Sequence, residues 1–361
     1  MLIGMEASSA VLQGLWFVLI AVLWIGFFFL EGFDFGVGML LPFIGKSDAK
    51  RRVMINTVGP TWDGNQVWLL TAGGATFAAF PGWYATLFSA LYLPLFLVLV
   101  GLIARGISFE YRSMNPDTKW RYTFDWLNTI GGALISLVLG VGFGNFVRGM
   151  KVGSDMLIQG DFVHRFFGLF TPFPLICGVL FVVLFASHGA QFLAIKTKDE
   201  VGAAARKVAD LLTPIAAVLL VAAWLYGTAG FSNNAYLGGW VQPVRWILGA
   251  LPVVCIAAAY VFGKILGRPG IAFIASGLSI ATLIMWFMLS IYGTLGFIGP
   301  NGEAPASLNM QTAASTQLTL TLMMIVAFIM VPIVLVYTIW AYWVFRKRLN
   351  TVNTPVDVVH A

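Results

Sequence analysis

The chain has 361 residues, of which 59% are hydrophobic and only 10% are charged. Soluble domains carry roughly 25% charged residues, so this composition excludes an ordinary soluble domain and indicates an integral membrane protein. The net charge of +6 does not indicate a nucleic-acid partner, because the basic residues fall in short clusters between apolar runs and report membrane topology. Cys177 and Cys255 lie inside apolar runs and form no CxxC motif, so neither a metal site nor a disulfide is expected.

A membrane-spanning helix needs roughly 20 mostly apolar residues, and we predict an all-α integral membrane fold of about nine such helices. The predicted spans are 13–41, 53–80, 83–107, 122–146, 166–195, 208–226, 244–265, 271–292 and 317–345. The second span is unusual, because its continuous apolar part is too short to cross alone. It crosses only if the polar stretch 56–66 also lies at membrane depth, covered by protein or a water-filled cavity.

Most of the 21 Lys and Arg residues fall on one side of this topology, and only Arg148, Lys151, Arg165 and Arg245 fall on the other. The positive-inside rule then places the N-terminus outside and the C-terminus in the cytoplasm, with an odd number of spans. We expect a single polytopic domain over 1–361. It would consist of one peripheral helix at 13–41, four-helix bundles at 53–195 and 208–345, and a polar tail at 346–361.

Two acids near the end of the first span are candidates for a role inside the membrane. Glu31 and Asp34 are three residues apart and share a helix face, and Gly32 and Gly36 form a small-xxx-small pair that allows close helix approach. For Glu31, a buried role and a solvated helix end are both consistent with the sequence. The flanking phenylalanines favour a buried Asp34.

The strongest candidate is Asp63, in the polar stretch Pro60-Thr-Trp-Asp-Gly-Asn-Gln-Val-Trp68. If the second helix begins near Arg52, Asp63 lies roughly 16 Å along it at 1.5 Å per residue, near the middle of a hydrocarbon core ~30 Å thick. Intramembrane acids are costly and typical of functional sites, so Asp63 is a candidate proton relay, with Asn65 and Gln66 able to hold water beside it. The alternative is a structural acid that bonds to Asn56, to Gln66 or to a partner.

Four other residues are weaker candidates. Of the two indoles, Trp68 is a better candidate than Trp62 for lining an apolar passage, and simple packing is the alternative for both. Arg105 ends the third predicted span and Asp125 opens the fourth, so both fall at the cytoplasmic end. They either snorkel to the interface or pair with charges such as Asp34.

Haem iron needs axial His, Met or Cys ligands, and histidines are few here. His360 lies in the tail, His164 lies in an external loop, and only His188 lies in a predicted membrane helix. A lone histidine there is more often a hydrogen-bonded packing residue than a ligand. We therefore expect no haem or other metal to be ligated by this chain.

The chain resembles, along essentially its whole length, subunit II of the cytochrome bd-type quinol oxidases. Trp62-Asp-Gly-Asn-Gln-Val-Trp68 is the most specific of the motifs that carry the resemblance. The others are Glu31-Gly-Phe-Asp-Phe-Gly-Val-Gly-Met39, Arg51-Arg-Val-Met-Ile-Asn56, Thr71-Ala-Gly-Gly74, Asp125-Trp126, Gly140-Val-Gly-Phe-Gly-Asn145 and Ser315-Thr-Gln-Leu-Thr-Leu320.

The resemblance implies a subunit of a prokaryotic inner-membrane complex that oxidises quinol and reduces dioxygen to water, with haem b and haem d ligated by subunit I. It implies a proton path at Asp63, an oxygen passage at Trp68, and a role of Asp34 in assembly or the haem environment. Glu31 and Asp34, as buried acids, are our own further candidates for the proton path. For Arg105 and Asp125, and for the polar motif around Trp62, it implies support of assembly or of the haem environment. Some members hold a structural quinone or small single-helix accessory subunits, and the sequence leaves both open.

Two alternatives remain at this stage. A proton-coupled secondary transporter would use Asp63 and Glu31 as coupling acids, with Pro60 breaking the second helix as in many transporter folds. A membrane scaffold would use Asp63 only structurally. Haem spectra in the purified complex distinguish the oxidase from the transporter, and normal turnover in Asp63→Asn would favour the scaffold.

Overall fold

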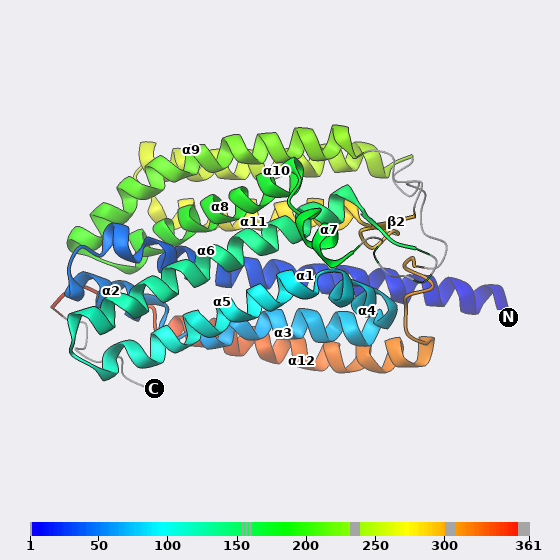
Figure 1. Ribbon diagram of the computed structural model, residues 1–361, viewed down its shortest axis with the longest axis horizontal. Helices are drawn as coiled ribbons and strands as arrows, with labels where there is room; N and C mark the ends of the chain where they lie inside the picture. The colour runs from blue at the N-terminus through cyan, green and yellow to red at the C-terminus, as the bar shows by residue number, and fades with distance from the viewer. Residues whose placement is uncertain are drawn as a thin grey trace.

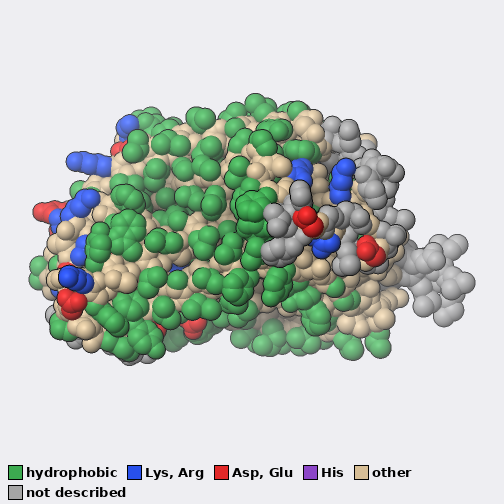
Figure 2. Space-filling model, viewed as in Figure 1, with side chains coloured by type: hydrophobic (Ala, Val, Ile, Leu, Met, Phe, Trp, Pro, Cys, Tyr) green, Lys and Arg blue, Asp and Glu red, His purple; other side chains and the backbone are tan. Residues whose placement is uncertain are grey.

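The computed structural model describes residues 2–153, 155, 158, 161–231, 239–299 and 308–352. Long helices run alongside one another to form an elongated body, with the start of α1 and the end of α12 at opposite ends (Figure 1). Figure 2 shows hydrophobic side chains across the middle of one face and charged side chains at its two ends, as expected for a multi-pass membrane protein. The side chain of His164, all of His360 and the tail beyond Val352 lie outside the described part.

The α-helices are α1 (Leu2–Ile44), α2 (Asp48–Val58), α3 (Trp62–Ala79), α4 (Pro81–Ala90), α5 (Tyr92–Tyr111), α6 (Thr118–Arg148), α7 (Phe162–Phe167), α8 (Pro172–Lys196), α9 (Asp199–Gly230), α10 (Val241–Tyr260), α11 (Pro269–Ser290) and α12 (Gln317–Val344). A 3₁₀ turn, η1 (Arg112–Met114), follows α5, and a π-helical turn, η3 (Val261–Ile265), follows α10. The strands β1 (Met150–Lys151) and β2 (Phe297–Ile298) pair in parallel at the end of the body opposite α2.

Eight of the helices in the described part are long and apolar enough to cross a membrane. The predicted second span, 53–80, is not among them and is not one helix: it is divided into α2 and α3. The break falls at Gly59 and Pro60 because proline has no amide hydrogen to continue the helical ladder. α3 nevertheless lies alongside α1 and α12 within the body (Figure 1), so a ninth crossing stays a prediction.

The third predicted span, 83–107, is also divided, into α4 and α5. α5 continues to Tyr111 and α6 begins at Thr118. The expectation that Arg105 and Asp125 stand at helix ends was therefore wrong. Both lie within helices, because their charges are compensated by other side chains and do not have to reach water.

The peripheral helix is α12 and not the first helix, which corrects the predicted grouping. α1 packs against α3, α6, α8 and α11 at the centre of the body, whereas α12 contacts only α1 and α3 to any extent. Only Leu320 and Met324 are buried on α12. The physical reason is that Glu31 and Asp34 of α1 must be kept from lipid, while α12 has no charged residue within its bounds.

Small residues allow α1 to occupy the centre. Gly36 faces the backbone of Gly189 on α8, and a side chain on either glycine would collide with the other helix. Close approach of this kind is typical of small residues at membrane helix interfaces. The predicted role of Gly36 in close packing is thus confirmed.

Candidate functional site: a buried charge network beside an open groove

The centre of the site is a fully buried ion triad. Arg105 Nη1 lies 2.8 Å from Glu31 Oε2, and Arg105 Nη2 lies 3.7 Å from Asp34 Oδ2. All three side chains have 0% exposure. The guanidinium also lies over the rings of Phe35 and Phe109, at 4.9 and 5.3 Å from their centroids. α1 therefore supplies two acids on one face, α5 supplies the cation, and the aromatic rings exclude lipid and water.

The network continues to α3 and α12 through two polar side chains. Asn65 Nδ2 donates to Asp34 Oδ2 at 2.7 Å, and the Tyr342 hydroxyl donates to Asn65 Oδ1 at 2.7 Å. Tyr342 was not singled out in the sequence, because an aromatic residue near the end of a membrane helix is ordinarily an interfacial anchor. Its hydroxyl is one of the few polar links between α12 and the rest of the protein.

Replacing Tyr342 with phenylalanine tests this link. The change removes the hydroxyl and leaves Asn65 Oδ1 without its partner, so we expect a loss of about 1–3 kcal/mol of stability. The measurement is the thermal unfolding midpoint of the purified complex, with Tyr337→Phe on the same helix as the control. Equal midpoints for the two variants would show that the hydrogen bond contributes nothing.

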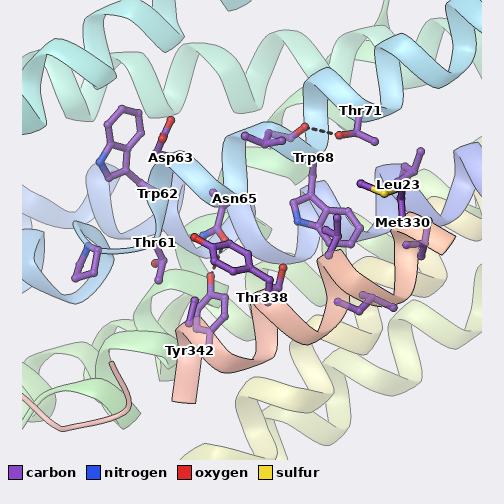
Figure 3. A pocket seen from close by; sticks show the side chains of 18 of the residues that line it. Leu23, Thr61, Trp62, Asp63, Asn65, Trp68, Thr71, Met330, Thr338 and Tyr342 are labelled. Carbon is purple, nitrogen blue, oxygen red and sulfur yellow. Dashed lines mark hydrogen bonds between the residues drawn. The ribbon is translucent and has the colours of Figure 1, made fainter. Parts of the chain in front are cut away.

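An open groove with a volume of about 1460 Å³ runs between α3 and α12, with α1 at its floor. Figure 3 shows Asn65 and Trp68 on the α3 side, with Thr338 and Tyr342 opposite on α12. The groove is polar near the α2 end, where Asn56, Asp63 and Glu110 line it, and apolar toward the other end. It therefore joins an apolar surface at membrane depth to a polar opening on the side that the predicted topology assigns to the cytoplasm.

Asp63 lies in the first turn of α3, exposed on the wall of this groove. No hydrogen bond or ion pair of Asp63 occurs among the described residues, so the predicted structural bonds to Asn56 or Gln66 are not formed. The depth estimate counted from Arg52 assumed one continuous helix and does not hold. The membrane depth of this part of α3 follows better from Asn65, which bonds to Asp34 of α1. Asp34 lies ten residues before the end of α1 at Ile44, which is roughly 15 Å along the helix.

The two indoles of the motif both line the groove. Trp62 stacks on Phe109, with ring centroids 5.1 Å apart, and so fixes α3 against α5. Trp68 rests on Gly26 of α1, where a side chain would collide with the indole. Gln66 is half-buried, and its Oε1 is buried without a hydrogen-bond partner in the described chain.

Asp125 belongs to a second, separate cluster near the α2 end. Its carboxylate accepts from Arg112 Nε at 2.6 Å and lies 2.8 Å from Arg51 Nε. Arg112 also donates to Asp48 at 2.8 Å, and Arg121 donates to Asp48 at 2.9 Å. This cluster joins α2 to η1 and α6, and the structure does not bring Asp125 together with Asp34 and Arg105.

Asp48 lies outside the membrane-spanning helices, and its pKa is lowered by the arginines of this cluster. Burial by itself would raise the pKa of Asp48, but the hydrogen bond and charge of Arg112, with the charge of Arg121, outweigh it and lower the pKa. A carboxyl with a depressed pKa in the folded chain stabilises the fold above its unfolded pKa. That contribution is lost as the pH falls through the folded pKa, so the cluster is intact at neutral pH.

His188 is a packing residue, as its solitary position predicted. Nδ1 lies 2.6 Å from the Ser276 hydroxyl, Nε2 lies 3.2 Å from the Phe29 carbonyl, and the ring stacks on Phe273 at 4.5 Å. Both ring nitrogens are occupied, so this imidazole does not fit a haem. Within the described residues no group of His, Cys, Asp or Glu is arranged to hold a metal ion.

Comparison with known proteins identifies the family. The family model for cytochrome bd terminal oxidase subunit II matches residues 12–345. A probable cytochrome oxidase subunit 2 from Haemophilus influenzae is 40% identical, covering 94% of this chain and 95% of the relative. The cytochrome bd-I ubiquinol oxidase subunit 2 of Escherichia coli is 37% identical, covering 94% and 96%.

The fold agrees with this assignment. A chain of the bd oxidase from Geobacillus thermodenitrificans has a similar fold, with a TM-score of 0.74 at 16% identity over 92% of this chain and 97% of that chain. The resemblance found in the sequence is confirmed, and the oxidase hypothesis replaces the transporter. This chain belongs to the cytochrome bd terminal oxidase subunit II family and is a subunit of a respiratory oxidoreductase complex of the membrane.

Proposed function

We propose that this chain pairs with a haem-bearing subunit I in a bacterial plasma membrane, in a complex that oxidises quinol and reduces dioxygen to water, generating proton-motive force. The observation that carries the proposal is the groove itself. Two residues of its walls, Asn65 and Tyr342, bond to the buried acid–arginine network, and the groove itself is large enough to receive other helices. The ubiquinol oxidase function named for the Escherichia coli relative supports the same conclusion.

The haems belong to the partner in this proposal. Haem b and haem d supply electron transfer and oxygen chemistry when bound, and they need axial ligands. His188 has both nitrogens occupied, and the Cys177 thiol is buried against the backbone of α6 at Gly144. The contribution of this chain is therefore to support assembly and to bring protons and oxygen to a haem-bearing surface.

The assembly role rests on α12 and α3. Most apolar side chains of α12 are exposed, including Val326 on the groove and Val336 away from it, at 57% and 67%. Lipid can cover either face, but the groove combines apolar surface with a concave shape and with wall residues that bond to the buried charge network. We assign the groove face to subunit I and the opposite face of α12 to lipid.

A matched pair of substitutions tests this assignment. Val326→Trp fills the groove and should strongly reduce the haem-bearing partner that co-purifies with this chain, because overpacked interfaces lose complementarity. Val336→Trp adds the same indole outside the groove and should leave co-purification near the wild-type level. The measurement is haem absorbance per unit of this chain after affinity purification. Equal losses, or none in either variant, would contradict the assignment.

The transport role rests on the residues around Asp63. Asp63 lies on the groove wall two residues before Asn65, which donates a hydrogen bond to Asp34. Protons entering at the polar end would meet Asp63 first and then the network of Glu31 and Asp34. Trp68 lies further along the same wall, where the groove becomes apolar. We propose that this apolar part, once subunit I covers the groove, carries oxygen toward the haems.

A further inference from the structure

A second, smaller cavity lies on the other side of α3 from the groove. Its volume is about 30 Å³, and α1, α3, α4, α6 and α11 all contribute to its walls. Aromatic side chains predominate, together with Leu87 and Met288, and Gly73 and Thr76 form the part contributed by α3. A cavity needs roughly 10–15 Å³ to hold a water-sized molecule, so this one has room for a diatomic molecule.

The chemistry of the walls disfavours water. A buried water typically makes about three hydrogen bonds. Here the Thr76 hydroxyl already donates to Ala72 at 2.8 Å, and Trp83 Nε1 is a single buried donor without a partner in the described chain. Nearly all of the remaining lining is carbon. Apolar cavities of this kind stay dry and bind xenon or small apolar molecules.

The position of the cavity connects two surfaces. Gly73 lines the cavity, whereas the next residue, Gly74, lines the groove, and no heavy atom lies within 4 Å of a side-chain carbon built on either. On the other side, Tyr84 stacks on Phe88 at 4.0 Å, and Phe88 is 40% exposed on the apolar surface. The cavity thus lies between the lipid-facing surface and the groove, separated from the groove by a segment of α3 with almost no side chains.

We propose that this cavity binds one small apolar gas molecule, the class to which dioxygen belongs, and holds it between the lipid and the groove. The site is distinct from the passage at Trp68, which lies on the groove side of α3. Its relevance to oxygen supply rests on the proposed function. Its capacity to bind a gas does not, because that follows from volume and wall chemistry alone.

The direct test uses xenon on the intact purified complex, followed by structure determination. Wild type should show xenon in the cavity. Gly73→Ala should lose it, because the added methyl enters the cavity, whereas Gly74→Ala should retain it, because its methyl enters the groove. Leu87→Phe provides a second filling variant from α4, should Gly73→Ala assemble poorly. An ordered water bonded to Trp83 Nε1, an empty wild-type cavity, or xenon persisting in both filled variants would overturn the proposal.

A kinetic measurement tests the supply of oxygen. Filling the cavity by Gly73→Ala should raise the KM for dioxygen several-fold, with a smaller effect on kcat, because the site affects delivery and not the reaction. An unchanged KM in a variant that has lost xenon would overturn the supply role. A complex that binds xenon but reduces no dioxygen would contradict the proposed function and leave the gas site standing.

Discussion

Arg105→Leu is expected to lower the stability of this chain by about 3–5 kcal/mol, the usual cost of removing one partner of a buried ion pair. The change leaves Glu31 and Asp34 without their cation at a site with no exposure to water. It also leaves Phe35 and Phe109 without the guanidinium that fills the space between them. Since marginal membrane subunits assemble poorly, the haem content of the purified complex should fall to a small fraction of the wild-type value.

Two further variants separate charge from volume. Arg105→Met combined with Glu31→Gln removes one charge of each sign and should recover part of the lost haem content. Arg105→Lys keeps the charge but loses the planar guanidinium, so an intermediate loss is expected. Haem per unit of protein and the unfolding midpoint are measured on the same samples. Normal haem content with reduced turnover alone in Arg105→Leu would show that this network serves catalysis and not assembly.

Asp125→Asn provides a matched comparison in the second cluster. It removes a buried carboxylate, but Arg112 keeps its bond to Asp48, and the side chain of Arg51 remains 18% exposed to solvent. The cation left behind is therefore better compensated than the acids beside Arg105. We expect a loss of haem content in the same direction as for Arg105→Leu, but smaller.

The sequence was enough to predict that Glu31 and Asp34 of α1 share a helix face, because this depends only on their separation along the chain. A separation of three residues puts Glu31 and Asp34 on one helix face whatever the rest of the fold does, and the structure keeps both buried on that face. Their partners could not be derived in this way. Arg105 and Tyr342 reach the acids only through the packing of α5 and α12, and no local pattern encodes which membrane helix packs on which.

The exchange of central and peripheral helices has a related cause. A helix face that contacts lipid is as apolar as one that contacts other helices, so hydrophobicity does not distinguish a buried helix from a peripheral one. By this measure α1 and α12 look alike. The distinguishing signal was present in the charges. α1 carries Glu31 and Asp34, which have to be buried in protein, and α12 carries no acid. Intramembrane charge therefore distinguishes the central helix from the peripheral one.

The sequence also indicated part of the break between α2 and α3. Pro60 and the polar residues around it indicated that the second span was irregular, but not that two separate helices would replace it. The consequence for the site is considerable. Because α3 begins afresh at Trp62, Asp63 lies in the first turn of α3. A continuous helix would have placed it in the middle of the helix.

Asp63→Asn is expected to slow oxygen consumption per haem by up to about 100-fold, the lower end of the range for a positioned proton-transfer group. Reduction of one dioxygen to two waters consumes four protons, and the groove provides a polar entry on the side assigned to the cytoplasm. Asparagine keeps the size of the side chain but cannot release a proton. Since Asp63 is exposed on the groove and has no hydrogen bond among the described residues, its replacement should not affect folding.

The comparison that decides the role of Asp63 is made in membranes of matched haem content. Asp63→Glu should retain more activity than Asp63→Asn, because a longer acid can still exchange protons with water in the groove. Asn56→Ala, on the same groove wall, removes an amide whose hydrogen bond is to its own helix at Arg52, and should leave the rate nearly unchanged. Equal rates for wild type and Asp63→Asn would exclude proton delivery through Asp63 and favour a purely structural subunit.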